Sequence, residues 1–238
     1  MYLLDRPAQG DLGADGHPVR GTVLSPPAPG LRRMWVGGRV RLSGGLRCGE
    51  RAIRRSQVTA AEEKRGRSGP LTFITVRRQV QQRGRIVVDE RQDVVYRPAP
   101  GPARPSGDPS ADDSAVAPGN AGRVIEVTPT LLFRFSALTY NAHRIHYDRG
   151  YACDVEGYPG LLVHGPLQAL TMAEAARSAA HPDSSGSADL TFDYRLSSPL
   201  FDHQGMVVSA VRGAGATATA VRDSYGRQTA SGTLRGDR

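Results

Sequence analysis

Hydrophobic and polar positions divide the chain into two halves with different expected secondary structure. The first half contains runs rich in Val, Ile, Thr and aromatic residues, separated by Gly-containing breaks that are typical of turns between strands. No helical period appears before residue 98, so we expect an antiparallel meander without a helix. The predicted strands are Trp35–Leu42, Arg51–Thr59, Leu71–Val80 and Arg85–Tyr96.

The second half combines strands with one long helix. The run from Pro166 to Ala180 begins with proline, which is favourable at the first helical position, and places Leu167, Leu170 and Ala173 on one face. A helix followed by a meander predicts an α+β fold in which the sheet curls around the helix, the hotdog arrangement. The predicted strands are Val124–Thr128 and Leu131–Ser136 before the helix, and Asp189–Leu196, Met206–Arg212, Thr217–Arg222 and Gln228–Leu234 after it.

The segment at residues 98–122 separates these halves. It is dominated by Pro, Ala, Gly, Ser and Asp, and its composition cannot bury enough apolar surface to offset the entropy of ordering. We therefore predict a flexible linker between a reduced sheet unit at residues 1–97 and a second unit at residues 123–238.

Composition excludes several classes of protein. A chain of 238 residues with 39% hydrophobic residues can bury a sizeable core without disulfides or metals, and its apolar runs are too short for a membrane-spanning helix. Cys48 and Cys153 form neither a disulfide framework nor a metal cluster. The residues 1–5 lack the basic region and apolar run of a signal peptide, so we expect a cytoplasmic protein without a membrane partner.

The net charge of +8 belongs to one segment. Residues 32–97 hold 17 of the 31 Lys and Arg residues against 6 acids, whereas residues 123–238 hold 11 of each sign. All basic residues except Lys64 are arginine, a bias typical of a GC-rich coding sequence. We therefore expect no nucleic-acid partner; a nucleic-acid binder would need salt-sensitive affinity for phosphates.

Reactive side chains are densest between Phe133 and Asp148, which include Tyr140, Asn141, His143 and His146. Further on, His164-Gly165 leads directly into the predicted helix. The start of a helix has unpaired N–H groups and a partial positive charge, which can stabilise a carbonyl oxygen that becomes negative during a reaction. The remaining histidines, His17, His181 and His203, are interpreted as structural.

The segment FSALTYNAHRIHYD at residues 135–148 resembles the type 2 hydroxyacyl-thioester dehydratases and mesaconyl-CoA hydratases, a narrower group within the MaoC-like hydratases. The first half is similar to the same group at DGHPVRG, RRMWVGGRVR and GRSGPLTFITV, which are residues 15–21, 32–41 and 66–76. The resemblance implies a double hotdog whose second half carries the chemistry and whose first half helps to form an acyl tunnel. Relatives have several dozen residues before the segment matching Tyr2, so we expect either that the natural start lies upstream of Met1 or that the first hotdog is an incomplete, reduced sheet.

The resemblance also implies roles for individual residues. His146 matches the catalytic histidine, and Gly165 matches the glycine whose N–H holds the thioester oxygen. Asn141 stands where the broader family has an aspartate, and an amide orients water or a hydroxyl but does not titrate. Tyr140, His143 and His164 are expected to contact substrate, and Arg65 and Arg67 are expected to touch CoA phosphates. No metal or cofactor is expected.

The function implied is the reversible hydration of an enoyl thioester, or dehydration of a 3-hydroxyacyl thioester, carried by CoA or by acyl carrier protein. The protein is expected to be an acyl-thioester hydro-lyase that can form a homo-oligomer. One alternative is a non-catalytic or repurposed hotdog protein that binds a thioester or a polyketide-like ligand. Another is a thioesterase, although no acid outside the motif suggests a hydrolytic base.

Overall fold

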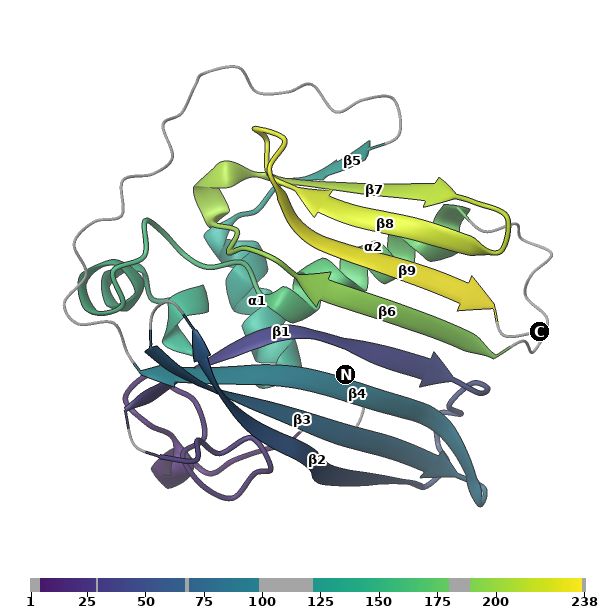
Figure 1. The fold of residues 1–238 in the computed structure, drawn as a ribbon, viewed down its shortest axis with the longest axis horizontal. Helices are drawn as coiled ribbons and strands as arrows, with labels where there is room; N and C mark the ends of the chain where they lie inside the picture. The colour runs from purple at the N-terminus through teal and green to yellow at the C-terminus, as the bar shows by residue number, and fades with distance from the viewer. Residues whose placement is uncertain (1–4, 29, 67–68, 99–121, 180–188, 237–238) are drawn as a thin grey trace.

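The computed structural model describes residues 5–28, 30–66, 69–98, 122–179 and 189–236. Within these ranges, nine strands form one antiparallel sheet in the order β2-β3-β4-β1-β6-β9-β8-β7-β5 (Figure 1). In the first half the strands are β1 (Leu31–Leu42), β2 (Ala52–Gly66), β3 (Gly69–Gln82) and β4 (Arg85–Pro98). In the second half they are β5 (Gly122–Ile125), β6 (Leu190–Leu196), β7 (Met206–Arg212), β8 (Ala216–Arg222) and β9 (Gln228–Gly236).

The two halves meet where β1 pairs with β6. Val40 lies opposite Phe192 in this pair, and Arg39 forms an ion pair at 2.6 Å with the opposing Asp193. The sheet is therefore continuous across the predicted boundary. The predicted linker at residues 98–122 lies outside the described residues except for its two ends, and the two-unit division stays a prediction.

The four strands predicted in the first half are confirmed; each extends beyond its expected bounds at one end or both, and β2 begins one residue later than expected, at Ala52. Among the described residues from 5 to 98 there is no α-helix, only a 3₁₀ turn at Gln9–Asp11. A small apolar cluster forms on this sheet around Val76, Val94 and Tyr96. Extended backbone without a helix agrees with the expectation for this half.

In the second half, α2 (Gly165–Ala179) packs against strands β6 to β9, as the sequence predicted (Figure 1). Its face toward the sheet carries Met172 and Ala176, which are fully buried. On the predicted apolar face, Leu167 is buried and Ala173 packs against the core, whereas Leu170 is 47% exposed and lines an open cavity together with Ala173. A sheet wrapped around a central helix confirms the α+β hotdog class.

The segment predicted as the strand Leu131–Ser136 is instead the helix α1 (Pro129–Thr139). The Thr128 side chain accepts a hydrogen bond from the Leu131 N–H at 3.1 Å, and Pro129 occupies the first turn, both of which favour helix initiation. Leu132 and Phe135 are then buried on the same face of the helix. The expected strand at Val124–Thr128 is correspondingly shorter and ends at Ile125.

None of the described helices is long and apolar enough to cross a membrane.

Candidate active site

The end of α1 places the first predicted site residues. Tyr140 adopts a left-handed conformation with φ 54° and ψ 35°, which turns the chain out of the helix. The N–H of Asn141 then donates to the carbonyl of Ser136 at 2.9 Å, and the Oδ1 of Asn141 accepts from the N–H of His143 at 3.1 Å. With its oxygen held by this turn, the Asn141 amide has its N–H donors to offer to a ligand.

His146 is buried at the end of a 3₁₀ turn, Arg144–His146. Its Nδ1 donates to the carbonyl of Leu162 at 2.7 Å, because a carbonyl oxygen can only accept. This bond leaves Nε2 with a free lone pair in the neutral ring. Burial, assisted by the charge of Arg33, lowers the pKa of His146 to about 4 despite the opposing bond to Leu162. At neutral pH the His146 ring is therefore uncharged and can accept a proton at Nε2.

The ring of His164 stacks on the ring of His146, with centroids 3.7 Å apart and an angle of 19°. His164 is fully buried, and its Nε2 lies 2.8 Å from the hydroxyl of Ser136. Burial lowers the pKa of His164 to about 2. Its Nδ1 is a buried nitrogen without a hydrogen-bond partner among the described residues. His164 therefore supports His146 as a neutral neighbour.

Gly165 begins α2 directly after His164, as predicted. The carbonyl of His164 accepts from the N–H groups of Leu167 and Gln168, whereas the N–H of a first helical residue has no partner within its helix. A Cβ on Gly165 would lie 2.6 Å from Cε3 of Trp35, so only glycine allows this approach of the helix to β1. The site thus has an N–H donor beside the stacked histidines.

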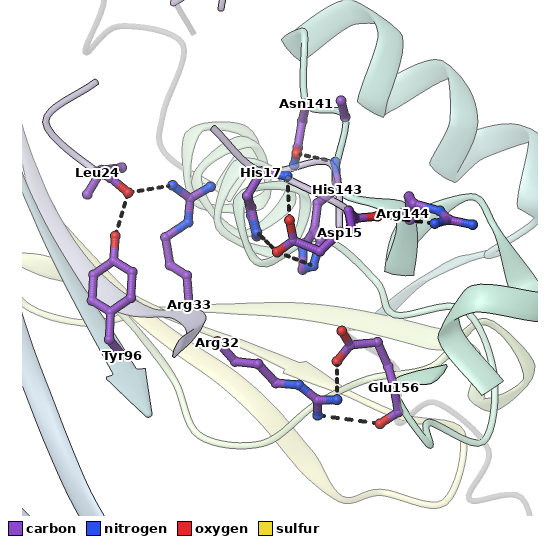
Figure 2. A network of polar contacts seen from close by, with 12 residues as sticks. Asp15, His17, Leu24, Arg32, Arg33, Tyr96, Asn141, His143, Arg144 and Glu156 are labelled. Carbon is purple, nitrogen blue, oxygen red and sulfur yellow. Dashed lines mark hydrogen bonds and ion pairs between the residues drawn. The ribbon is translucent and has the colours of Figure 1, made fainter. Parts of the chain in front are cut away.

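The first half contributes two residues that the sequence interpretation missed. The Asp15 carboxylate faces one nitrogen of each of two imidazole rings (Figure 2): its Oδ2 is 3.1 Å from Nδ1 of His17 and 4.0 Å from Nε2 of His143. The rings of His17 and His143 lie 3.7 Å apart, and His143 meets His146 edge-on at 5.4 Å. His17 was interpreted as structural. The signal that could have linked His17 and Asp15 to the site was the similarity of the DGHPVRG stretch, residues 15–21, to relatives.

The loop carrying Asp15 is held against the motif by several close contacts. The carbonyl of Asp15 accepts from the N–H of Arg144 at 2.8 Å, and the carbonyl of Ala14 accepts from Nη1 of Arg144 at 3.1 Å. A Cβ on Gly16 would overlap the carbonyl oxygen of Ala142, and its φ of +85° also favours glycine. The histidine cluster is therefore built by both halves of the chain.

Asp15, His17 and His143 also form a group with the donor types that bind a divalent transition metal. One ligand atom from each lies within 4.8 Å of the others. In the structure these atoms serve the hydrogen bond and ring contacts described above. Burial holds the pKa values of His17 and His143 well below the usual value, so both rings are neutral at pH 7.

An open cavity of about 1190 Å³ lies beside this cluster, between the first-half sheet and the two helices. Tyr140 and Asn141 line it, as do Ser136 and Pro166, the immediate partners of His164 and Gly165. His143, His146, His164 and Gly165 are not part of the lining. The rest of the wall is mainly apolar, with Trp35, Val80 and Phe192 among its residues.

The predicted phosphate-binding arginines are not part of the cluster. Arg65 is exposed near the end of the edge strand β2, and Arg67 lies outside the described residues. The hairpin between β2 and β3 nevertheless lies at the same end of the sheet as Arg33. Thr72 on β3 pairs with Tyr96 on β4, and Tyr96 in turn pairs with Arg33 on β1. Contact of Arg65 with a CoA phosphate stays a prediction.

Comparison with known proteins identifies relatives for most of the chain. The family model for hydroxyacyl-thioester dehydratase type 2 matches residues 1–202. The chain is 45% identical over 206 residues to a mesaconyl-C(4)-CoA hydratase of Chloroflexus aurantiacus, covering 85% of this chain and 69% of the relative. It is 43% identical over 81 residues to a mitochondrial hydroxyacyl-thioester dehydratase type 2 of Schizosaccharomyces pombe, covering 34% of this chain and 26% of that protein.

Solved structures agree on the fold. HtdX of Mycobacterium tuberculosis matches 86% of this chain and 77% of its own with a TM-score of 0.65 at 17% identity. A MaoC-like dehydratase from Phytophthora capsici matches 89% of this chain and 74% of its own with a TM-score of 0.61 at 15% identity. At such identities the likeness shows the fold alone, and it agrees with the α+β class in which an antiparallel sheet wraps a helix.

Proposed function

Because the chain belongs to the hydroxyacyl-thioester dehydratase type 2 family, we propose that it catalyses the reversible hydration of an enoyl thioester. The reverse reaction is dehydration of a 3-hydroxyacyl thioester. The observation that carries the proposal is the neutral, buried His146, whose Nδ1 is fixed on Leu162 beside the start of α2. Such a ring offers one basic nitrogen in a fixed direction next to a donor for a developing oxyanion.

In the hydration direction, Nε2 of His146 takes a proton from water as the water oxygen bonds to C3. The C2–C3 π electrons move toward the carbonyl, and the Gly165 N–H holds the resulting enolate oxygen. The same proton then passes from His146 to C2, which regenerates the neutral ring and completes the addition of one water. Asn141 donates an amide N–H that orients the water but transfers no proton.

The large cavity supplies space for the acyl group. Its mainly apolar lining suits a hydrocarbon chain. Two of its lining residues connect it to the site: Ser136 contacts His164, and Pro166 directly follows Gly165. Coenzyme A or acyl carrier protein is the proposed carrier. Substrate contacts by Tyr140, His143 and His164 and a homo-oligomeric state stay predictions.

The proposal is tested by following loss of the enoyl-thioester absorbance with crotonyl-CoA in wild type and His146→Ala. We expect turnover to fall by roughly 10²–10⁴ in the variant, the range for loss of a general acid-base group. Circular dichroism checks that the variant folds. A folded His146→Ala protein with near-normal turnover would remove His146 from the chemistry, and a wild type inactive on every enoyl thioester would indicate a hotdog protein that only binds its ligand.

A further inference from the structure

Asp15, His17 and His143 bring three metal-binding side chains together from the two halves of the chain (Figure 2). Oδ2 of Asp15 lies 3.1 Å from Nδ1 of His17 and 4.0 Å from Nε2 of His143, and one donor atom of each residue lies within 4.8 Å of the others. Ligands of a tetrahedral zinc ion, each about 2.0–2.2 Å from the metal, are roughly 3.3–3.5 Å apart. The observed separations lie on both sides of this value.

The carboxylate of Asp15 is already oriented toward the two rings. Its Oδ1 accepts from the N–H of His17 at 3.0 Å, and the carbonyl of Asp15 accepts from the N–H of Arg144 at 2.8 Å. Hydrogen bonds of this kind fix the carboxylates of metal sites in place. The rings of His17 and His143 are tilted by 35° to each other, so each has to turn before its nitrogen faces a shared metal.

The donor set selects the class of metal. Two imidazoles and one carboxylate suit zinc and similar transition metals, whereas Mg²⁺ and Ca²⁺ prefer oxygen ligands. Both rings bind a metal in their neutral form, which burial favours because it holds the pKa values of His17 and His143 well below the usual value. A neutral His17 with its proton on Nε2 offers the lone pair of Nδ1.

Access and charge limit how such a site binds. The side chains of His17 and His143 are 12% and 10% exposed and that of Asp15 is 30% exposed, so solvent reaches the carboxylate and a water can serve as the fourth ligand. The positive charge of Arg33 lowers the pKa of both rings and therefore also opposes a cation beside them. One carboxylate against this guanidinium favours micromolar rather than very tight binding.

We propose that Asp15, His17 and His143 bind a divalent transition metal of the zinc class, which links the loop carrying Asp15 to the segment that carries His146. The chain spacing hides this site, because Asp15 and His17 stand more than a hundred residues before His143. The inference does not depend on the proposed hydration, since binding is measured without substrate.

The test titrates untagged, full-length protein, first stripped of metal by a chelator, with Zn²⁺ in a calorimeter. We expect one Zn²⁺ per chain with a micromolar or lower Kd, and no competition from millimolar Mg²⁺. Co²⁺ in place of Zn²⁺ should give the visible absorption of a four-coordinate site. His17→Gln and Asp15→Asn should each weaken Zn²⁺ binding by at least about 10–100-fold, the loss caused by removing even an outer partner of a ligand. Asp15→Asn retains an oxygen for the N–H of His17.

His203→Gln is the matched control, because His203 is an exposed imidazole whose Nδ1 lies 3.7 Å from a carboxylate oxygen of Asp202. It should keep the wild-type Kd. Arg33→Met should bind Zn²⁺ severalfold more tightly, because the opposing charge is removed. A wild type that binds no Zn²⁺, or binding that survives in His17→Gln and Asp15→Asn but is lost in His203→Gln, would overturn the proposal.

Thermal unfolding gives a second measurement, because a metal that binds only the folded chain stabilises it. Zn²⁺ at about one hundred times its Kd should raise the Tm of wild type and of His203→Gln by roughly 5–10 °C. The Tm of His17→Gln should not change with Zn²⁺, and circular dichroism without metal checks that this variant folds. An equal rise in His17→Gln would show that Zn²⁺ binds elsewhere.

Discussion

The imidazole of His146 lies on that of His164, with ring centroids 3.7 Å apart and a bond from Nδ1 of His146 to the carbonyl of Leu162. Two stacked rings in a buried site cannot both carry charge at this distance without strong repulsion. Burial already lowers the pKa of both, to about 4 for His146 and about 2 for His164. The pair is therefore held in the neutral form that a general base requires.

The first prediction concerns the pH dependence of hydration. Because the pKa of His146 is about 4, the basic form persists to lower pH than for an ordinary histidine near 6.5. We expect kcat/KM for hydration to stay nearly constant between pH 8 and 5.5 and to fall at about pH 4–5. Initial rates with circular dichroism at each pH provide the measurement. An acid limb centred near 6.5 would contradict the neutral buried base.

The second prediction concerns Asn141, whose oxygen accepts from the N–H of His143. Asn141→Ala removes both this turn contact and the amide donors, and we expect turnover to fall about tenfold or more through lost positioning. Asn141→Asp keeps an oxygen acceptor for the turn and adds a titrating group, so it should retain activity and add a second limb to the pH–rate profile. Full activity and an unchanged profile in Asn141→Ala would exclude a role in the chemistry.

Strands and helices were predicted correctly where the hydrophobic pattern fitted only one type of secondary structure. The long strands of the first half and the helix after Gly165 follow from β-branched runs and a proline-started run of helix formers. The error at Leu131–Ser136 arose because its apolar residues fit both a short strand and one face of a helix. The Thr128-Pro129 start, which the structure uses as a cap, was the local signal for the helix.

Only the part of the candidate site that lies in short local motifs was predicted from the sequence. His146, Asn141 and Gly165 lie in two short motifs, so local sequence was enough to select them. Asp15 and His17 reach the cluster only because the first-half loop folds onto the motif, a long-range contact that no spacing in the chain encodes. The ion pair between Arg32 and Glu156, at 2.7 Å, likewise depends on tertiary structure.

The third prediction concerns the docking of that loop. Gly16→Ala places a Cβ against the carbonyl of Ala142 and should displace Asp15 and His17 from His143. Gly21→Ala is a matched control, because Gly21 has a similar φ of +78° but no atom within 4 Å of the place a Cβ would occupy. Both variants should lose roughly 1 kcal/mol of stability to left-handed strain, whereas only Gly16→Ala should lower turnover, by about tenfold or more.

Denaturant unfolding and steady-state kinetics on the two glycine variants provide this comparison. Equal turnover in the two, at matched folded fractions, would show that the first-half loop contributes nothing to catalysis.

The fourth prediction concerns Gly165. Gly165 is the first residue of α2, where the advantage of alanine over glycine in helix interiors does not apply. In Gly165→Ala the added Cβ would overlap Cδ1 of Leu196 and lie 2.6 Å from Cε3 of Trp35, and overpacking should cost roughly 1–3 kcal/mol and displace the N–H donor. Turnover should fall by up to about 10²–10³. Adding Leu196→Ala should recover part of the stability, and unimpaired turnover in Gly165→Ala would argue against the oxyanion role.

The last prediction follows from the buried histidines. The pKa of His146 in the folded state, about 4, lies below the unfolded value near 6.5, so between these values the unfolded chain binds a proton that the folded chain does not. The stability is fully present above pH 6.5 and is lost as pH falls toward 4, by about 2 kcal/mol at pH 5 for this residue alone. His17, His143 and His164 act in the same direction. Urea unfolding at pH 7 and pH 5 should show the loss, and His146→Gln should reduce it by about 2 kcal/mol. A free energy of unfolding equal at both pH values would mean that these rings are not held neutral by the fold.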